Sequence, residues 1–190
     1  MQPLYDKFYE ANIDERKVEG DSTESGVLKF YENIENIKFI RDQFPQVVKG
    51  RDEIKVPFNS KDKYSCYMRE VKESHLKEEN NYWLAFKGAP EYIIKRCSRY
   101  IFNGKEMPIN ESFKNSFVGA NKAFALMGER VMGFAYLKLD KNEFPEGFDF
   151  ENNLNKNSED KNAPVVPNYP TTGLCFVGLI ALEDPPRYVN

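Results

Sequence analysis

The chain has 190 residues, and its 27 basic and 30 acidic side chains give a formal net charge of −3. This slightly acidic balance argues against nucleic acid as a partner, because nonspecific nucleic-acid binding depends on a basic surface. Three scattered cysteines and one histidine, His75, argue against a disulfide framework, most protein metal sites and a Ser-His-Asp triad.

The first half of the chain is predicted to hold two helices followed by strands. Asp21 and Glu24 have capping-box spacing, and apolar residues follow with a helical period, so we expect a helix from about residue 22 to 35. A second helix is expected at 38–43, before Pro45. Short β-branched or aromatic runs predict strands at 47–48, 54–58, 64–71 and 82–86. The polar stretch 73–81 would join the last two as a hairpin.

In the second half, turn and cap signals set the expected boundaries. Pro90 suits the first position of a short helix, and Asn103-Gly104 is typical of a tight hairpin turn. We expect a long helix at 111–127, with Asn110 as its N-cap and Gly128 as its C-cap glycine. One apolar stripe is predicted along that helix, formed by Phe113, Phe117, Ala120, Phe124 and Met127.

Two long strands complete the expected sheet. They are predicted at 130–139 and at 174–182, the second as a buried central strand, while the Asn-rich stretch 151–171 is expected to be a mobile loop. The longest apolar run, at 174–182, is too short to cross a bilayer as a helix. Hairpins connect most of the strands, so the predicted fold is α/β (α+β) with a largely antiparallel sheet flanked by helices.

Lys87-Gly88-Ala89-Pro90-Glu91 is the segment with the most chemical interest. The chain contains no Gly-x-x-x-x-Gly-Lys-Ser/Thr loop and no Gly-x-Gly-x-x-Gly loop, so common phosphate-binding motifs are excluded. Lys87 ends an apolar strand, and Gly88 would let another molecule approach the backbone. The residues alone leave two interpretations open, namely a lysine that meets a phosphate or an aromatic ring, and a plain strand-to-helix turn with a solvated lysine.

Three further residues carry a functional and a structural interpretation. Phe58 beside Lys61 and Lys63 could stack a base, or it could belong to the core. Arg130 could clamp a phosphate with its guanidinium fork, or it could complement a helix C-terminus. Glu24 could act in a site, or serve only as the carboxylate of a capping box.

Taken together, these segments resemble the nucleotide-binding (N) domain of P-type cation-transporting ATPases, in particular the sodium/potassium and proton/potassium α-subunit branch. The motifs that carry the resemblance extend over residues 18–187 and follow one another in the same order as in members of the family. They are Gly20-Asp21-Ser22-Thr23-Glu24-Ser25, Pro57-Phe58-Asn59-Ser60 with Lys63-Tyr64, Lys87-Gly88-Ala89-Pro90-Glu91, Gly128-Glu129-Arg130-Val131, and Asp184-Pro185-Pro186-Arg187. Two further segments are similar to sequence segments of that branch, namely Phe144-Pro145-Glu146-Gly147-Phe148 and residues 174–180.

The resemblance implies an ATP site without a P-loop. Phe58 would stack on the adenine, Glu24 would lie near the adenine amino group, and Arg130 would lie near the phosphates. The other residues implied to bind nucleotide are Lys63, Ser65, Lys87, Gly88, Ala89 and Ala135. Ser65 and Ala135 depart from the branch, where glutamine and cysteine are usual.

The resemblance also implies a domain layout and a larger parent protein. Residues 1–182 would form the N domain, and residues 183–190 would be a hinge strand in which Asp184, Pro185, Pro186 and Arg187 lead to a phosphorylation domain. The Asp-Lys-Thr-Gly-Thr motif is absent, so we expect a fragment without turnover of its own and without a catalytic residue or metal site.

The parent would be a membrane-embedded pump that carries this domain on its cytosolic face. ATP or ADP, with Mg²⁺ bound as Mg-ATP, would be the ligands. The actuator, phosphorylation and transmembrane domains, together with a β subunit, would be the partners. A rival hypothesis is an N-domain-like module that has lost nucleotide binding and serves as a spacer or a protein-docking domain.

Overall fold

The computed structural model describes residues 22–71, 82–155, 157 and 165–183. Several predictions lie outside these residues: Asp21 of the capping box, the loop at 73–81, the middle of the Asn-rich stretch and the hinge residues Asp184 to Arg187. The chain divides into two compact units, residues 1–43 and 44–190, and each is described by itself. The prediction of one domain that ends at residue 182 stays a prediction.

The first unit contains the two predicted helices, α2 (Ser22–Glu32) and α3 (Ile37–Gln43). The α2 helix ends three residues earlier than expected. Asn36 caps the start of α3. Its Oδ1 accepts a hydrogen bond from the backbone N–H of Lys38 at 2.8 Å and so satisfies a free N–H of the first turn. Both helices are therefore confirmed, with the first one shorter than predicted.

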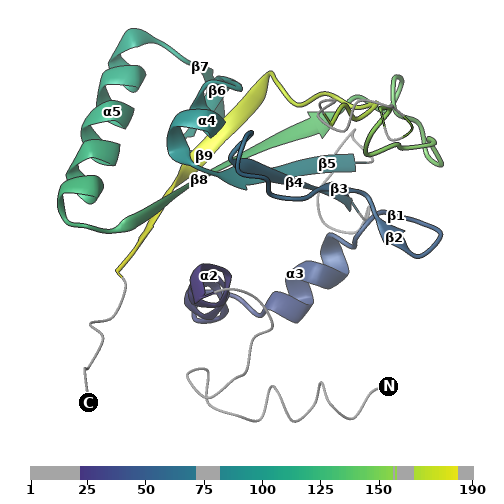
Figure 1. Ribbon diagram of the computed structural model, residues 1–190, viewed down its shortest axis with the longest axis horizontal. Coiled ribbons are helices and arrows are strands. Elements are labelled where there is room, and N and C mark those ends of the chain that lie inside the picture. The colour runs from purple at the N-terminus through teal and green to yellow at the C-terminus, as the bar shows by residue number, and fades with distance from the viewer. Residues whose placement is uncertain (1–21, 72–81, 156, 158–164, 184–190) are drawn as a thin grey trace. The chain divides into compact units, whose positions relative to one another are not determined.

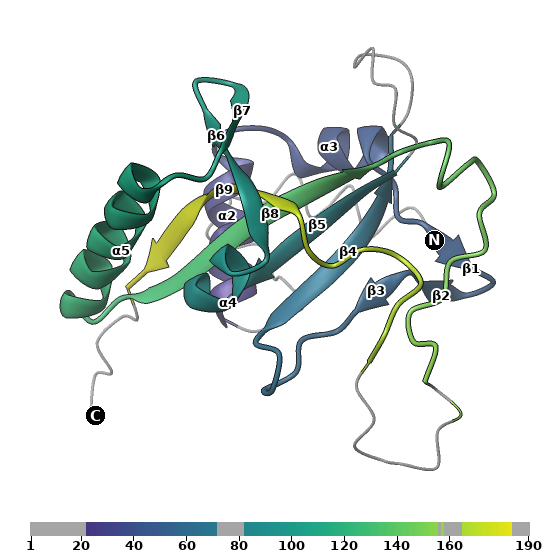
Figure 2. The ribbon, with the colours of Figure 1, turned by 90° about the horizontal axis from the view of Figure 1, so that it is seen from above.

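The second unit is built on a seven-stranded sheet with the order β3-β4-β5-β8-β9-β6-β7 (Figures 1 and 2). Its strands are β3 (Lys55–Val56), β4 (Tyr64–Glu70), β5 (Tyr82–Gly88), β6 (Cys97–Phe102), β7 (Lys105–Pro108), β8 (Arg130–Leu139) and β9 (Leu174–Leu182). All neighbouring strands are antiparallel except β6 and β9, which are parallel. The predicted α/β class with a largely antiparallel sheet is thus confirmed.

Beside this sheet, a two-stranded ribbon pairs β1 (Val48–Lys49) with β2 (Asp52–Glu53). The strand predicted at 54–58 is much shorter than expected, since only Lys55 and Val56 pair with β4. Phe58 therefore lies outside regular structure. Within the described residues, no helix is long and apolar enough to cross a membrane.

Turn and cap residues act as the sequence predicts. Asn103 and Gly104 join β6 to β7 with φ of 50° and 74°, which is the left-handed pair that a tight hairpin turn requires. Asn110 caps α5 (Glu111–Leu126) by accepting the N–H of Phe113 at 2.8 Å. Gly128, with φ of 76°, closes the helix. Its N–H and that of Glu129 bond to the carbonyls of the last turn, the pattern of a Schellman motif.

The core lies on one face of the sheet, the face that carries α4 (Pro90–Ile94) and α5 (Figure 1), and Phe144, Phe150 and Tyr169 also belong to it. Ile93 of α4 is fully buried there. Phe113 and Phe117 of α5 pack against Phe176 of β9, with ring centroids 5.8 and 5.5 Å apart. The core strands contribute alternate residues to this face, which include Cys66, Met68, Leu84, Phe86, Ala135 and Leu139.

Two burial predictions are wrong in part. Ala120 is exposed and Met127 is 70% exposed, and the residues of the α5 stripe that pack against the core are Phe113 and Phe117. Strand β9 is internal to the sheet, but only Leu174 to Phe176 are buried and Val177 is 52% exposed.

The described ends of the Asn-rich stretch make defined contacts. Leu154 donates its N–H to the carbonyl of Val166 at 2.6 Å, and Asn168 donates to Glu151 at 3.0 Å. Tyr169 is 5% exposed and its ring lies edge-on to Phe150 at 6.1 Å. These residues belong to the packed part of the unit, and the mobility expected for 151–171 stays a prediction.

Candidate functional site

The end of β5 is pressed against the start of β4. A Cβ atom added to Gly88 would lie 2.3 Å from the carbonyl oxygen of Lys63 and 2.7 Å from the Cα of Tyr64. Both distances are shorter than real Cβ contacts. The N–H of Ala89 donates to that same Lys63 carbonyl at 2.9 Å. Only glycine fits at this position, so Gly88 sets how closely Lys87 and Lys63 approach each other.

Ser65 and Lys87 are directly opposite each other in the β4–β5 pair. Opposed residues share a face, and theirs is the face that turns away from Cys66 and Phe86 of the core. Ser65 is 1% exposed, and its hydroxyl has no hydrogen-bond partner among the described residues. The ammonium of Lys87 lies over the ring of Tyr67, 5.6 Å from the centroid.

Phe58 lies in the loop between β3 and β4 and is 59% exposed. The core interpretation of this ring is therefore excluded. Asn59 orders the loop after it, because its Oδ1 accepts the N–H groups of Lys61 at 3.0 Å and Asp62 at 2.7 Å. Lys63 follows in the left-handed region, with φ of 59°. The loop thus presents an aromatic ring and a lysine next to the end of β5.

Arg130 and Ala135 both lie on β8 but have different surroundings. The register pairs Gly133 with Gly88, so Arg130 lies three residues beyond that pair, about 10 Å along the strand, and is exposed. It is therefore at the same end of the sheet as Lys63 and Gly88. Ala135 is opposite Phe86 and is 4% exposed, on the core face. The structure therefore does not bring Ala135 together with Ser65 and Lys87.

Glu24 lies in the first turn of α2, in the unit formed by residues 1–43. An acidic residue in a first turn complements the positive end of the helix dipole. The position of Glu24 therefore agrees with the structural interpretation, in which this carboxylate stabilises the start of a helix. Its place near a bound adenine stays a prediction.

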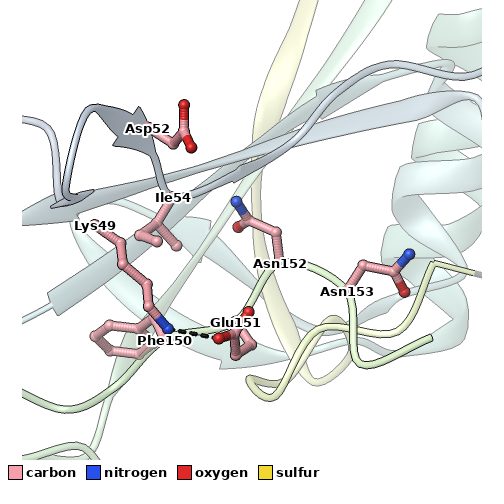
Figure 3. A pocket seen from close by; sticks show the side chains of 7 residues that line it. All are labelled: Lys49, Asp52, Ile54, Phe150, Glu151, Asn152 and Asn153. Carbon is pink, nitrogen blue, oxygen red and sulfur yellow. Dashed lines mark hydrogen bonds and ion pairs between the residues drawn. The ribbon is translucent and has the colours of Figure 1, made fainter. Parts of the chain in front are cut away.

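A cavity of about 370 Å³ lies elsewhere in the second unit, between the β1–β2 ribbon and residues 150–153 (Figure 3). Lys49 reaches across it and pairs with Glu151 at 2.5 Å and with Asp149 at 2.7 Å. These ion pairs raise the pKa of the Lys49 ammonium. Asp52 adds a further carboxylate to the lining. An acidic lining whose lysine is already paired is a poor site for a triphosphate.

Two contacts in the strand-end region were not predicted by the sequence analysis. Asn59 orders the loop after Phe58, and an Asn two residues before the bonded N–H is a recognisable turn signal. Tyr67 contacts Lys87 diagonally across two strands, and this contact follows only from the register.

The second unit is an α/β domain in which Phe58, Lys63, Lys87 and Arg130 lie toward one end of the sheet. The family model for the P-type ATPase cytoplasmic domain N matches residues 6–188, and the chain belongs to this family. The resemblance drawn from the sequence motifs is thereby confirmed.

Several curated relatives are similar over most of this chain. The sodium/potassium-transporting ATPase subunit alpha of Tetronarce californica is 39% identical over 173 residues, which cover 90% of this chain. The potassium-transporting ATPase alpha chain 1 of Xenopus laevis is 36% identical over 92% of it. The human sodium/potassium-transporting ATPase subunit alpha-3 is 37% identical over 90% of it. The matched part is 15% of the length of each relative.

Proposed function

We propose that the strand-end region binds ATP by its adenine and phosphates, in the manner that family membership suggests. The observation that carries the proposal is the Lys87–Gly88 strand end. Its lysine lies beside a glycine that cannot carry a side chain, with Lys63 directly before the neighbouring strand β4. A flat backbone floor with cations around it suits a base that carries a polyphosphate tail.

Each side chain has a distinct role in this proposal. The exposed ring of Phe58 stacks on the adenine, and Gly88 with Ala89 forms the floor of the site. Lys63 and Lys87 attract the nucleotide, and the buried Ser65 lies opposite Lys87 on the same face of the sheet. At the same sheet end Arg130 meets the phosphates. Ala135 is left out of the contact set, because its side chain faces the core.

The proposed affinity is weak. Stacking of one base on one aromatic side chain contributes about 1–3 kcal/mol, and partly solvated lysine and arginine contacts add about 0–1 kcal/mol each. A dissociation constant of some hundreds of micromolar, about −5 kcal/mol, follows. Weak binding suits a domain that must release its nucleotide in every cycle.

In the parent protein, we propose, this domain delivers the γ-phosphate of Mg-ATP to an aspartate in a separate phosphorylation domain. Asp184 to Arg187 would form the hinge for that closure. The actuator and transmembrane domains and a β subunit are the further partners proposed for the parent, which would be a cation pump with this domain on the cytosolic side of its membrane. Because the chain contributes no phosphorylated aspartate, we propose that it does not turn over ATP by itself.

Displacement of a fluorescent adenine nucleotide by ATP tests the binding proposal. The expected result is competitive displacement at submillimolar to millimolar ATP. Failure of ATP to displace the probe, with the chain folded, would refute nucleotide binding and favour the spacer or docking module instead. Steady-state hydrolysis of ATP by the purified chain would contradict the proposed division of labour between domains.

A further inference from the structure

The loop that follows Phe58 is a single turn, and Asn59 bonds to both ends of it. The Oδ1 atom of Asn59 accepts the backbone N–H groups of Lys61 at 3.0 Å and Asp62 at 2.7 Å. These are the second and third N–H groups after Asn59, which are the groups that an N-cap side chain satisfies at the start of a helix. The turn closes at Lys63, whose N–H donates to the backbone carbonyl of Asn59 at 2.9 Å.

The amide of Asn59 is held in one orientation by a carboxylate. Its Nδ2 donates to Oδ2 of Asp62 at 2.8 Å, so that Nδ2 faces an acceptor while Oδ1 faces two donors. Rotation of the amide by half a turn would set Oδ1 against the carboxylate and Nδ2 against the two N–H groups. Both lone pairs of Oδ1 are engaged within the turn, so this atom has no acceptor capacity left for a ligand.

The far end of the turn is joined to the end of β5. Lys63 is in the left-handed region, with φ of 59°, a conformation that a residue with a side chain keeps only where its surroundings impose it. Its carbonyl accepts the N–H of Ala89 at 2.9 Å and lies so close to Gly88 that a Cβ atom there would clash. The turn therefore has one fixed position relative to the Gly88–Ala89 strand end.

The direction of the Phe58 ring depends on this turn. Phe58 is 59% exposed, so packing against the core does not fix its ring. Its backbone continues directly into Asn59, where the turn begins. Without the Asn59 side chain the first N–H groups of the turn lose their acceptor, and the backbone next to Phe58 gains conformational freedom. A ligand that stacks on the ring must then bear the cost of ordering it.

We infer that Asn59 is a positioning residue for nucleotide binding, which holds the Phe58 ring where it stacks on the adenine and does not contact the nucleotide itself. This inference rests on the proposed function. Asp62 contributes by orienting the Asn59 amide, and Lys63 contributes by joining the turn to β5.

The first comparison is between the wild-type chain and Asn59→Ala, with ATP titrated into each labelled chain. The amide proton shifts of Lys61 and Asp62 in the ligand-free chains report on the turn, because a hydrogen bond moves an amide proton downfield. Asn153→Ala is the matched control, since Oδ1 of Asn153 also accepts two backbone N–H groups of a loop, at 3.0 and 3.1 Å, elsewhere in the unit. Dispersed methyl signals establish that each variant is folded.

The second comparison exchanges the two partners, with Asn59→Asp and Asp62→Asn in one chain. The exchange keeps an acceptor oxygen at position 59 and restores one amide opposite one carboxylate, now in reversed places. Like Asn59→Ala, the exchanged chain has the net charge of wild type, so the overall electrostatic attraction of ATP is unchanged. A difference in affinity between these two chains therefore reports on the hydrogen bonds of the turn.

The third comparison asks whether Asn59 acts through Phe58. Asn59→Ala is introduced into Phe58→Ala, and its effect on the dissociation constant for ATP is compared with its effect in wild type. A residue that only stabilises the fold weakens binding by the same factor in both backgrounds. A residue that positions the ring has nothing left to position once the ring is removed.

Asn59→Ala is expected to lose the downfield amide shifts and to bind ATP about three- to tenfold more weakly. The exchanged chain and Asn153→Ala are expected to bind like wild type. In the Phe58→Ala background the expected effect of Asn59→Ala is less than about twofold.

Three results would overturn the positioning role while ATP binding by wild type stands. They are equal affinity of Asn59→Ala and wild type, an exchanged chain that binds as weakly as Asn59→Ala, and an undiminished effect in the Phe58→Ala background. A wild-type chain that shows the downfield amide shifts but does not bind ATP would overturn the proposed function, and with it the role of Asn59.

Discussion

Replacement of Gly88 by alanine tests how the strand end is assembled. The added Cβ would lie 2.3 Å from the carbonyl oxygen of Lys63, where ordinary contact begins at 3.4 Å. Both nearest atoms belong to the backbone of Lys63 and Tyr64, so rotation of a side chain cannot relieve the clash. The two strands must separate by about 1 Å at this point, in a region packed to protein density.

The cost of that separation has two sources. Overpacking of this kind costs about 1–3 kcal/mol. Weakening of the bond from Ala89 N–H to the Lys63 carbonyl adds about 1 kcal/mol. A total of about 3 kcal/mol corresponds to a fall in melting temperature of about 6–12 °C for a chain of this size. ATP affinity falls as well in our account, because Lys63 and Lys87 are displaced.

Thermal unfolding followed by the fluorescence of Trp83, the single tryptophan, measures this effect. Gly119→Ala is the matched control, because its Cβ would meet no atom within 4 Å on α5. Alanine favours a helix over glycine by about 0.5–1 kcal/mol, so this control raises the melting temperature. Gly133→Ala, whose Cβ would lie 3.1 Å from the Cα of Pro90, falls between the two. A Gly88→Ala chain that melts like wild type would refute the steric argument.

Three further predictions concern stability. Ser65→Ala removes a buried hydroxyl that lacks a described partner, so chemical denaturation should show an unfolding free energy unchanged or raised by about 1 kcal/mol; a clear loss would mean that the hydroxyl is bonded. Asn110→Ala removes the α5 cap and should cost about 1 kcal/mol, while a change near zero would contradict the capping role. Burial raises the pKa of the Cys97 thiol to about 12 from 9.0, and a raised folded pKa means that the stability contribution is full below pH 9 and is lost between pH 9 and 12. Wild type should therefore lose stability over that pH range more steeply than Cys97→Ala, and parallel pH profiles would contradict this.

Local signals in the sequence predicted much of the fold. Asn110 and Gly128 bound α5 because a cap and a left-handed glycine act within a few residues. Asn103-Gly104 specifies its turn for the same reason. By contrast, the β1–β2 ribbon has two residues per strand and carries no period that a sequence pattern can show.

The contents of the site were predicted less completely, because they depend on pairing between strands. The resemblance named Ala135 as part of the site wall, but the register places it opposite Phe86 on the core face. A shift of one residue reverses the face of every side chain on a strand. The contact of Tyr67 with Lys87 depends on the same register. Arg130, at a strand start after a helix cap, could be placed by local signals alone.

An NMR titration of the labelled chain with ATP, run beside Phe58→Ala, tests the central claim most directly. Phe58 is 59% exposed, so its removal should leave the fold and its spectrum intact. The account predicts shifts around Phe58, Lys87 and Arg130 in wild type, and about tenfold or weaker binding in the variant. A well-folded wild-type spectrum that does not change up to millimolar ATP, or identical titrations of the two chains, would contradict it.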